Sequence, residues 1–259
     1  MMQNLLPDLN ELISHAFWPL IRTLALFSTA PVFSEKAAPK KVRVGLAVLI
    51  AFLLAPTLPE NRVVLMSVTG LWVAIRELLI GSAIGLTVQF IFAALRFAGE
   101  VVGMQMGLSF AAFFDPSGNQ SMPVLARILN VLAVLLFLAG NGHLYLIKML
   151  ADSYTLLPIS GATLTRSSFY RLPEAAGLIF SSGLQIGMPV VALLLALNLT
   201  LGLLNRLTPQ LSIFVIGFPI SITLGLGALL LLMYNLPTLF QDQMNEIFSA
   251  VNNILVGFR

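Results

Sequence analysis

Apolar residues occupy most of this 259-residue chain, in long runs that short polar stretches separate. A helix needs about 20 apolar residues to cross the core of a bilayer, and several runs approach or exceed that length. We therefore predict an all-α, membrane-embedded protein with about six apolar helical segments. They cover residues 12–33, 44–58, 63–75 continued by 78–95 beyond Arg76 and Glu77, 128–147, 172–205 and 207–241.

Local signals predict where these helices are irregular. Pro189, Pro209 and Pro219 lie within the last two segments, which we expect to be kinked or discontinuous. Residues 148–174 form the most polar part of the chain, which indicates an exposed connection. The tail, residues 242–259, places apolar residues at helical spacing and therefore predicts a short amphipathic helix.

Composition favours a membrane environment. The chain is 58% hydrophobic and 10% charged, whereas a typical soluble domain has about 25% charged residues. The net charge of +3 and the scattered basic residues give no sign of a nucleic-acid partner. Cysteine is absent, so we expect no disulfide and no Cys-ligated metal. The N-terminus lacks the basic start of a signal peptide, so we expect the first segment to be retained, with residues 34–41 as an inside loop.

Residues 99–127, GEVVGMQMGLSFAAFFDPSGNQSMPVLAR, do not fit a simple membrane span. Gly99, Gly103 and Gly107 come four apart, which places them on one helix face where a neighbouring backbone can approach. Turn formers at 115–119 end the helix and Pro123 begins another. Irregular apolar backbone at membrane depth is tolerated where protein buries it or where it lines a cavity. We predict a loop tucked into an interior; the alternative is ordinary helix packing that an ordinary turn ends.

Isolated charges inside the apolar segments are candidates for buried or interface positions. A charge at the bilayer centre costs about 2.5–3.5 kcal/mol, so we expect Arg22 and Glu100 to lie against a partner helix or in a wet interior. Arg206 separates the last two segments and is expected at a helix end on a membrane surface, with an ion-path role as the alternative. Arg76 and Glu77 are adjacent, so each is expected to find a different partner.

We find no catalytic constellation in the sequence. Glu100 and Asp115 share a stretch, but no second acid or histidine lies near them at a catalytic spacing. His15 and His143 belong to no metal-ligand motif, and there is no phosphate loop, nucleophile elbow or metalloprotease motif. We therefore expect no enzymatic activity, no cofactor and no metal site.

The stretch LLNRLTPQLSIFVIGFP, residues 203–219, resembles the signature of the FliR/SctT family of type III export proteins. Order and spacing match the family from about residue 15 to 220, and the uncharged residues 213–220 resemble its flagellar branch. The signature residues are Asn205, Arg206, Pro209, Gln210 and Pro219. Three further stretches agree with the family: Phe17–Leu20 with Arg22, Ser28–Pro31 leading to Pro39–Lys40, and Gly99–Glu100 through Asp115–Pro116.

The resemblance implies a single-copy subunit of the flagellar export gate, located in the bacterial inner membrane and the flagellar basal body. Family members assemble with FliP and FliQ, associate with FlhB and FlhA, contact membrane lipid, and pass unfolded flagellar proteins out of the cytoplasm. Their helices form stacked hairpins that stand largely above the membrane plane, so a hydropathy count does not fix topology. The resemblance also implies a FliP-like part, residues 1–174, and a C-terminal helical hairpin, residues 175–259.

In the family, the loop after the glycine-spaced helix forms a plug that closes the channel. Carried onto this chain, the plug is residues 106–119. Its occluding side chains would be Phe110, Phe113 and Phe114, with Met106 and Leu108 at its start. The alternative function is an ion-coupled secondary transporter, which would also use broken helices. Such a transporter usually shows two matching halves with an acid or polar cluster, and this sequence shows neither.

Overall fold

The computed structural model describes residues 5–33, 39–58, 67–108, 122–159, 166–207 and 213–258. This part of the chain is almost entirely helical and contains no strand, which confirms the all-α prediction. The helices are α1 (Leu5–Thr29), α2 (Lys40–Leu54), the short 3-10 turn η2 (Ala55–Thr57), α3 (Val68–Gln105), α5 (Val124–Ala139), α6 (Gly142–Leu156), α7 (Arg166–Ala176), α8 (Leu178–Leu207) and α9 (Ile213–Gly257).

Several helices suit a membrane. Among the described residues, three stretches are long and apolar enough to cross a bilayer, each with a mean hydropathy of 2.1: Val68–Gln105, Tyr170–Leu207 and Ile216–Gly257. A fourth candidate arises if α5 and α6 together form one broken span. Their break falls at Asn141, whose φ of 56° is left-handed. The chain is a membrane protein, and three or four segments within its described ranges are long and apolar enough to span a bilayer.

The helix boundaries correct three predictions. Helix α3 runs unbroken through Arg76 and Glu77, because both residues are good helix formers and neither breaks the backbone pattern. The amphipathic tail is helical, but it is the end of the 45-residue helix α9 and not a separate helix. Pro189 and Pro219 lie inside the continuous helices α8 and α9, so neither residue ends a helix, and kinks at these residues stay a prediction. The segment predicted to be an exposed connection includes most of α6, which buries Leu150, Ser153 and Tyr154.

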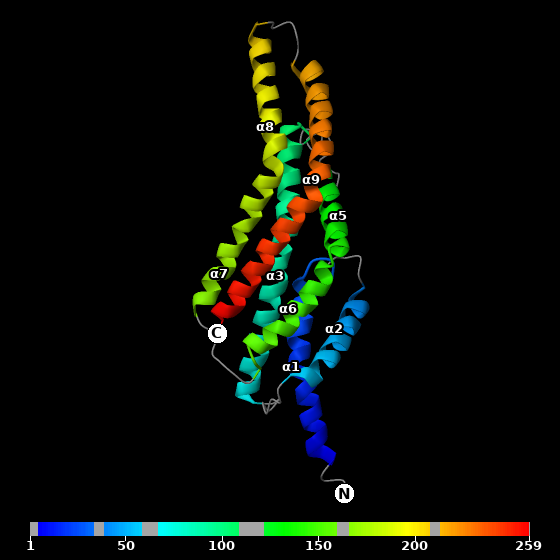
Figure 1. The fold of residues 1–259 in the computed structure, drawn as a ribbon, viewed down its shortest axis with the longest axis vertical. Helices are drawn as coiled ribbons and strands as arrows, with labels where there is room; N and C mark the ends of the chain where they lie inside the picture. The colour runs from blue at the N-terminus through cyan, green and yellow to red at the C-terminus, as the bar shows by residue number, and fades with distance from the viewer. Residues whose placement is uncertain are drawn as a thin grey trace. The chain divides into compact units, whose positions relative to one another are not determined.

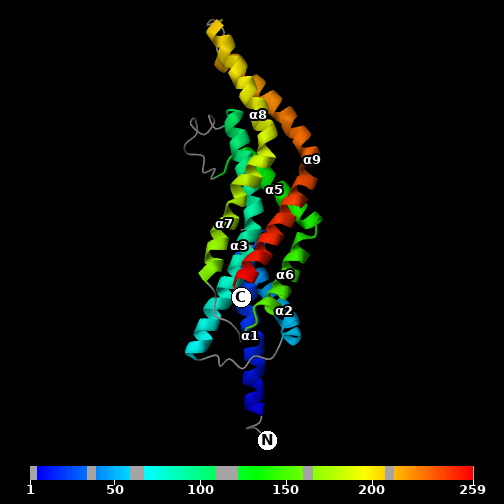
Figure 2. The same ribbon diagram turned by 60° about the vertical axis from the view of Figure 1, so that its left-hand side comes forward.

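The described residues divide into two compact units, and α3 and α9 contribute to both. The first unit holds α1, α2, the first part of α3, α6, α7 and the end of α9. Figures 1 and 2 both show α2 beside α1. Gly81 and Gly85 allow α3 to approach α1 closely, since an added Cβ at Gly85 would lie 2.9 Å from Ala30 N and Leu26 O. The small-residue spacing in this part of α3 therefore serves helix packing.

The second unit is built around the later part of α3, with α5, α8 and most of α9. The Phe92 ring on α3 makes edge contacts with Phe137 of α5 and Phe240 of α9, at centroid distances of 5.5 and 6.4 Å. Phe97 makes a similar contact of 5.3 Å with Phe180 of α8. Aromatic side chains of α3 thus contact all three of its neighbours, which places α3 at the centre of this unit.

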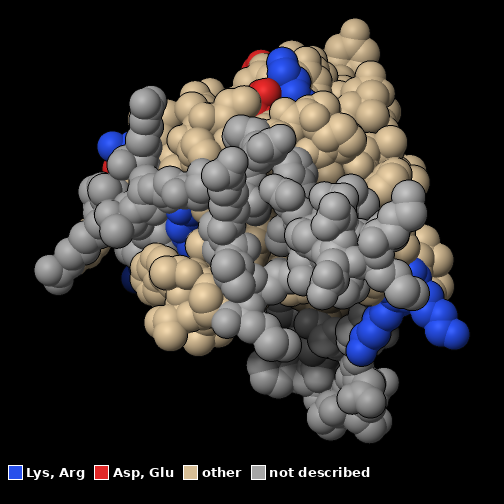
Figure 3. Space-filling view, turned by 90° about the horizontal axis from the view of Figure 1, so that it is seen from below, with Lys and Arg blue, Asp and Glu red and all other residues tan. Residues whose placement is uncertain are grey.

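Apolar side chains are widely exposed in the second unit. Leu199 on α8 is 68% exposed, and Leu230 and Tyr234 on α9 are 73% and 87% exposed. An apolar groove with a volume of about 790 Å³ lies where Leu193 of α8 meets Pro219 and Leu231 of α9. By contrast, Figure 3, which is seen from below, shows several Lys and Arg side chains among the described residues on that face. Exposed apolar surface on this scale is typical of contact with lipid or with other proteins.

Candidate functional site

The C-terminal end of α3 precedes the predicted plug, and a Schellman motif terminates the helix. The amide of Leu108 donates to Gly103 O at 3.0 Å, and the amide of Gly107 donates to Met104 O at 3.0 Å. This pair of bonds satisfies carbonyls that the helix end would leave without partners, and it requires a left-handed residue. Gly107 has a φ of 79°, which glycine adopts without the steric penalty that a Cβ would bring. The helix therefore ends at Gln105, before the turn formers at 115–119 that were predicted to end it, and Gly107 caps the helix and is not part of its packing face.

The three glycines of the predicted packing face serve different purposes. A Cβ on Gly99 would lie 2.7 Å from Ala126 Cα and 2.8 Å from Ala126 N, so α5 crosses α3 there at backbone distance. A Cβ on Gly103 would meet Leu125 Cδ1 at 3.7 Å, an ordinary contact. Gly107 lies beyond the helix and forms the cap. Close packing through glycine thus holds at Gly99, and Gly183 of α8 adds a second case, since its Cβ would lie 2.7 Å from Ala94 O.

The predicted plug is described only in part. Met106 is 1% exposed and Leu108 is half-buried. Phe110, Phe113 and Phe114 lie outside the residues that the structure describes. The first residues of the predicted plug are therefore packed within the second unit, and the assignment of the three phenylalanines stays a prediction.

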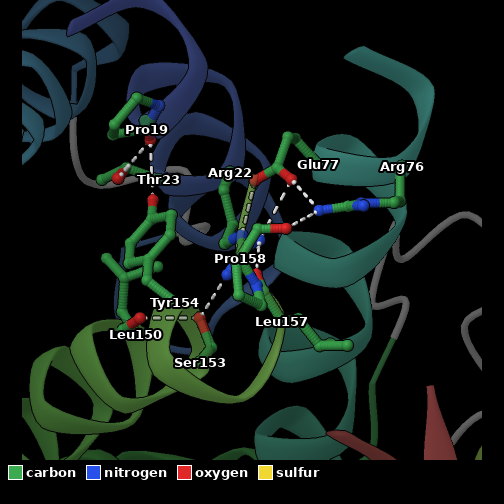
Figure 4. A network of polar contacts seen from close by, with 10 residues as sticks. All are labelled: Pro19, Arg22, Thr23, Arg76, Glu77, Leu150, Ser153, Tyr154, Leu157 and Pro158. Carbon is green, nitrogen blue, oxygen red and sulfur yellow. Dashed lines mark hydrogen bonds and ion pairs between the residues drawn. The ribbon is translucent and has the colours of Figure 1, made fainter. Parts of the chain in front are cut away.

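A buried polar network joins α1, α3 and α6 in the first unit (Figure 4). Arg22 of α1 binds Glu77 of α3 through two hydrogen bonds, from Nε at 2.7 Å and from the second guanidinium nitrogen at 3.0 Å. Both side chains are 0% exposed. A bidentate pair of this kind fixes geometry as well as charge. The structure thus places Arg22 against a partner helix, as expected, and names Glu77 as its partner.

The rest of the guanidinium of Arg22 is held by α6. It donates to Ser153 Oγ at 2.9 Å and to Leu157 O at 2.9 Å. Its carbon lies 4.1 Å from the centre of the Tyr154 ring, a cation–π arrangement. The Tyr154 hydroxyl in turn donates to Pro19 O at 3.0 Å. Arg22 therefore links three helices with its donors and its ring contact.

Arg76 joins the same network from α3. It donates to Glu77 Oε1 at 3.3 Å and to Pro158 O. The expectation that Arg76 and Glu77 have separate partners is therefore wrong in part, because Glu77 contacts both arginines. The carbonyls of Leu157 and Pro158, just beyond the C-terminal end of α6, accept hydrogen bonds from Arg22 and Arg76. A helix C-terminus carries partial negative charge, which favours cations at this position.

The network acts as a structural clamp. A buried ion pair gains little net energy over apolar packing, but the loss of one partner leaves a buried charge uncompensated. The helices that carry Arg22, Glu77 and Ser153 are therefore held in the arrangement that gives these buried polar groups their partners. The apolar surroundings of Arg22 and Glu77 along the chain indicated that both were candidates for burial. Ser153 and Tyr154 were not predicted, because they lie in a polar segment that carries no signal of burial. Among the described residues, no group of three or more His, Asp or Glu side chains is arranged to hold a metal ion.

Comparison with known proteins decides the family. A family model described as "Bacterial export proteins, family 1" matches residues 13–247. The flagellar biosynthetic protein FliR of Escherichia coli K12 is 52% identical, over 92% of each chain. The chain belongs to the FliR family of bacterial export proteins. The resemblance drawn from the signature is thereby confirmed.

Other FliR-family relatives extend the comparison. The FliR protein of Pectobacterium carotovorum is 50% identical over 96% of this chain and 95% of its own length. The FliR protein of Bacillus subtilis is 27% identical over 91% of this chain and 92% of its own. The family match spans both the Arg22 network and residues 106–119, so both lie within the part of the chain that the family model describes.

The FliR signature lies mostly on the surface of the described structure. Asn205 and Arg206 are exposed in the last turns of α8, and Pro219 is exposed within α9. Pro209 and Gln210 lie outside the described residues. Arg206 thus sits near a helix end, as expected. The remaining candidate charge, Glu100, is half-buried on α3.

Proposed function

We propose that this protein is a pore-forming subunit of the flagellar type III export gate, through which unfolded flagellar proteins leave the cytoplasm. It belongs to the FliR family of bacterial export proteins, and as a member it is a component of the flagellar export apparatus. The finer proposal is that it is a structural, non-enzymatic subunit in the inner membrane part of the flagellar basal body. Family membership is the observation that carries the proposal.

The exposed apolar surface supports assembly into a larger complex. Helices α8 and α9 expose large side chains such as Leu199, Leu230 and Leu231 beside the apolar groove. We propose that FliP and FliQ subunits cover this surface and that FlhB and FlhA associate with the complex. Helix faces of this kind need either lipid or partner helices to remove them from water, and a gate subunit would meet both.

We further propose that the loop of residues 106–119 closes the channel. The apolar Phe side chains of this loop suit a seal that excludes ions and that a passing chain displaces. Supporting this, the loop starts at a capped helix end where Met106 is buried. Phe110, Phe113 and Phe114 would be the occluding side chains, with Leu108 and Met106 at the base.

Native mass spectrometry tests the assembly. The tagged chain is co-expressed with FliP and FliQ and gently extracted from membranes. One copy in a large complex with several copies of the smaller helical subunits would support the gate. A lone chain or a homodimer would overturn this proposal and favour the ion-coupled transporter.

Ion conductance tests the plug. The double variant Phe110→Ala/Phe113→Ala, in the assembled complex, is expected to raise ion leakage across the membrane because the apolar seal is shortened. Leu138→Ala is a matched control, since Leu138 is a 41% exposed apolar side chain on α5. Unchanged leakage together with unchanged secretion in the double variant would show that the plug assignment is wrong.

A further inference from the structure

Met106 fills a space that Gly225 leaves on the buried face of α9. A Cβ on Gly225 would lie 2.7 Å from Met106 Cγ and 2.8 Å from its Sδ and Cε atoms. Real Cβ atoms essentially never approach other atoms within 3.0 Å, so a methyl group at position 225 would displace the flexible end of the Met106 side chain. The methionine side chain therefore occupies the volume that any larger residue at position 225 would need.

The surroundings of Gly225 show that this space is a gap in an otherwise side-chain-filled stripe. The same face of α9 buries residues at helical spacing: Ser221, Leu229, Leu232, Leu236 and Phe240. Gly225 continues that spacing without a side chain. Gly227, two residues further along the same helix, is exposed, and a Cβ added there would have no neighbouring atom within 4 Å. The gap at position 225 is therefore specific to the face that contacts Met106.

The backbone fixes the direction in which Met106 enters this gap. Its amide donates to Val102 O at 2.9 Å, and the Schellman bonds of Gly107 and Leu108 follow directly. Met106 is 1% exposed, whereas Met104, at the same helix end, is 57% exposed. Of these two similar side chains, only the one opposite Gly225 is buried.

We propose that Met106 is a positioning residue, which seats on Gly225 and thereby fixes the end of α3 on α9. This inference rests on the proposed plug function, because it assigns the start of the plug an anchoring role. Met106 holds the point from which the loop departs and does not itself occlude the channel. An unbranched thioether suits this task, since it fills an irregular gap without a fixed shape.

Two substitutions perturb the seat from opposite sides. Gly225→Ala inserts a methyl group into the space of the Met106 side chain, and Met106→Ala empties that space. The matched controls are Gly227→Ala on α9 and Met104→Ala on α3. The natural chain has no cysteine, so Leu108→Cys in each background gives a single alkylation site at the end of α3. The full chain is used, assembled with FliP and FliQ.

Alkylation of a half-buried site follows local opening of the structure. Both Gly225→Ala and Met106→Ala are expected to raise the alkylation rate at position 108 roughly tenfold, with no change in either control. The double variant Met106→Ala/Gly225→Ala should show less than the product of the two single effects, because contacting residues are coupled. It also keeps the test valid if Gly225→Ala alone fails to fold. Equal alkylation rates in Gly225→Ala and Gly227→Ala would overturn the proposal that Met106 is held against Gly225. Independent effects of the two substitutions in the double variant would overturn it as well.

Ion leakage separates this inference from the plug proposal. If the Phe110→Ala/Phe113→Ala variant leaks, Gly225→Ala is expected to leak as well, and a tight Gly225→Ala channel would overturn the positioning role. If alkylation responds as expected but the phenylalanine variant does not leak, the seat on α9 stands as a packing contact and the plug proposal fails.

Discussion

Removing the carboxylate of Glu77 is expected to destabilise the protein strongly. Glu77→Ala leaves Arg22, which is 0% exposed, and Arg76, which is 4% exposed, without their shared anion. Breaking a buried ion pair by deleting one partner costs about 3–5 kcal/mol. At about 2–4 °C per kcal/mol for a chain of this size, the melting temperature should fall by roughly 6–20 °C.

Two further variants test the physical reason. Glu77→Gln keeps one acceptor oxygen but places an amide donor against a guanidinium, so it should fall between the wild type and Glu77→Ala. The double variant Arg22→Met/Glu77→Leu removes both charges and keeps apolar volume. Exchanging a buried pair for apolar residues is often neutral or stabilising, so this variant should recover most of the lost stability.

Tryptophan fluorescence gives a local readout of this unfolding. Trp18 is 1% exposed on α1, one turn before Arg22, and the only other tryptophan, Trp72, is 51% exposed. In a Trp72→Phe background, thermal denaturation in detergent followed at Trp18 reports on the network. Glu100→Ala, at a half-buried acid of the same helix α3, is the control. An equal loss in Glu77→Ala and Glu100→Ala, or no recovery in the double variant, would refute the reasoning.

Three glycine substitutions give further expectations, all measured as melting temperatures. Gly99→Ala forces a methyl group to within 2.7 Å of the Ala126 backbone and should cost about 1–3 kcal/mol of stability through overpacking. Gly103→Ala should cost far less, because its added Cβ would lie 3.7 Å from the nearest neighbouring atom. Equal losses of stability in the two variants would contradict the close crossing of α3 and α5. Gly107→Ala places a Cβ at a φ of 79° and should cost about 1–2 kcal/mol, and an unchanged melting temperature would argue against the left-handed cap.

Hydrophobic pattern predicted the helices far better than their ends. Apolar runs identify helices because each must bury or shield its own surface, but α3 ends at Gln105, before the turn formers at 115–119 that were predicted to end it. The pattern failed at Arg76–Glu77, which it treated as an interruption. Along the sequence, a charged pair marks a polar position. In the folded protein, a partner elsewhere in the chain can neutralise it inside a continuous helix.

The candidate network was only half predictable for the same reason. An arginine in an apolar segment must find a partner, so Arg22 could be selected as a buried residue from the sequence. Its partner Glu77 is 55 positions away, and the Ser153 hydroxyl and Leu157 carbonyl are 131 and 135 positions away. Nothing local to α6 indicates that its end would receive two guanidinium groups.

The sequence by itself determined the all-helical class, the membrane character and the family, because these depend on composition, periodicity and a run of signature residues. Only the tertiary structure decided which glycine approaches a backbone, which one caps a helix, and that Met106 lies opposite Gly225. Such contacts join residues that are distant along the chain, and their distances depend on how helices cross. A spacing along one helix can state that a close approach is permitted, but only the packed partner determines where it occurs.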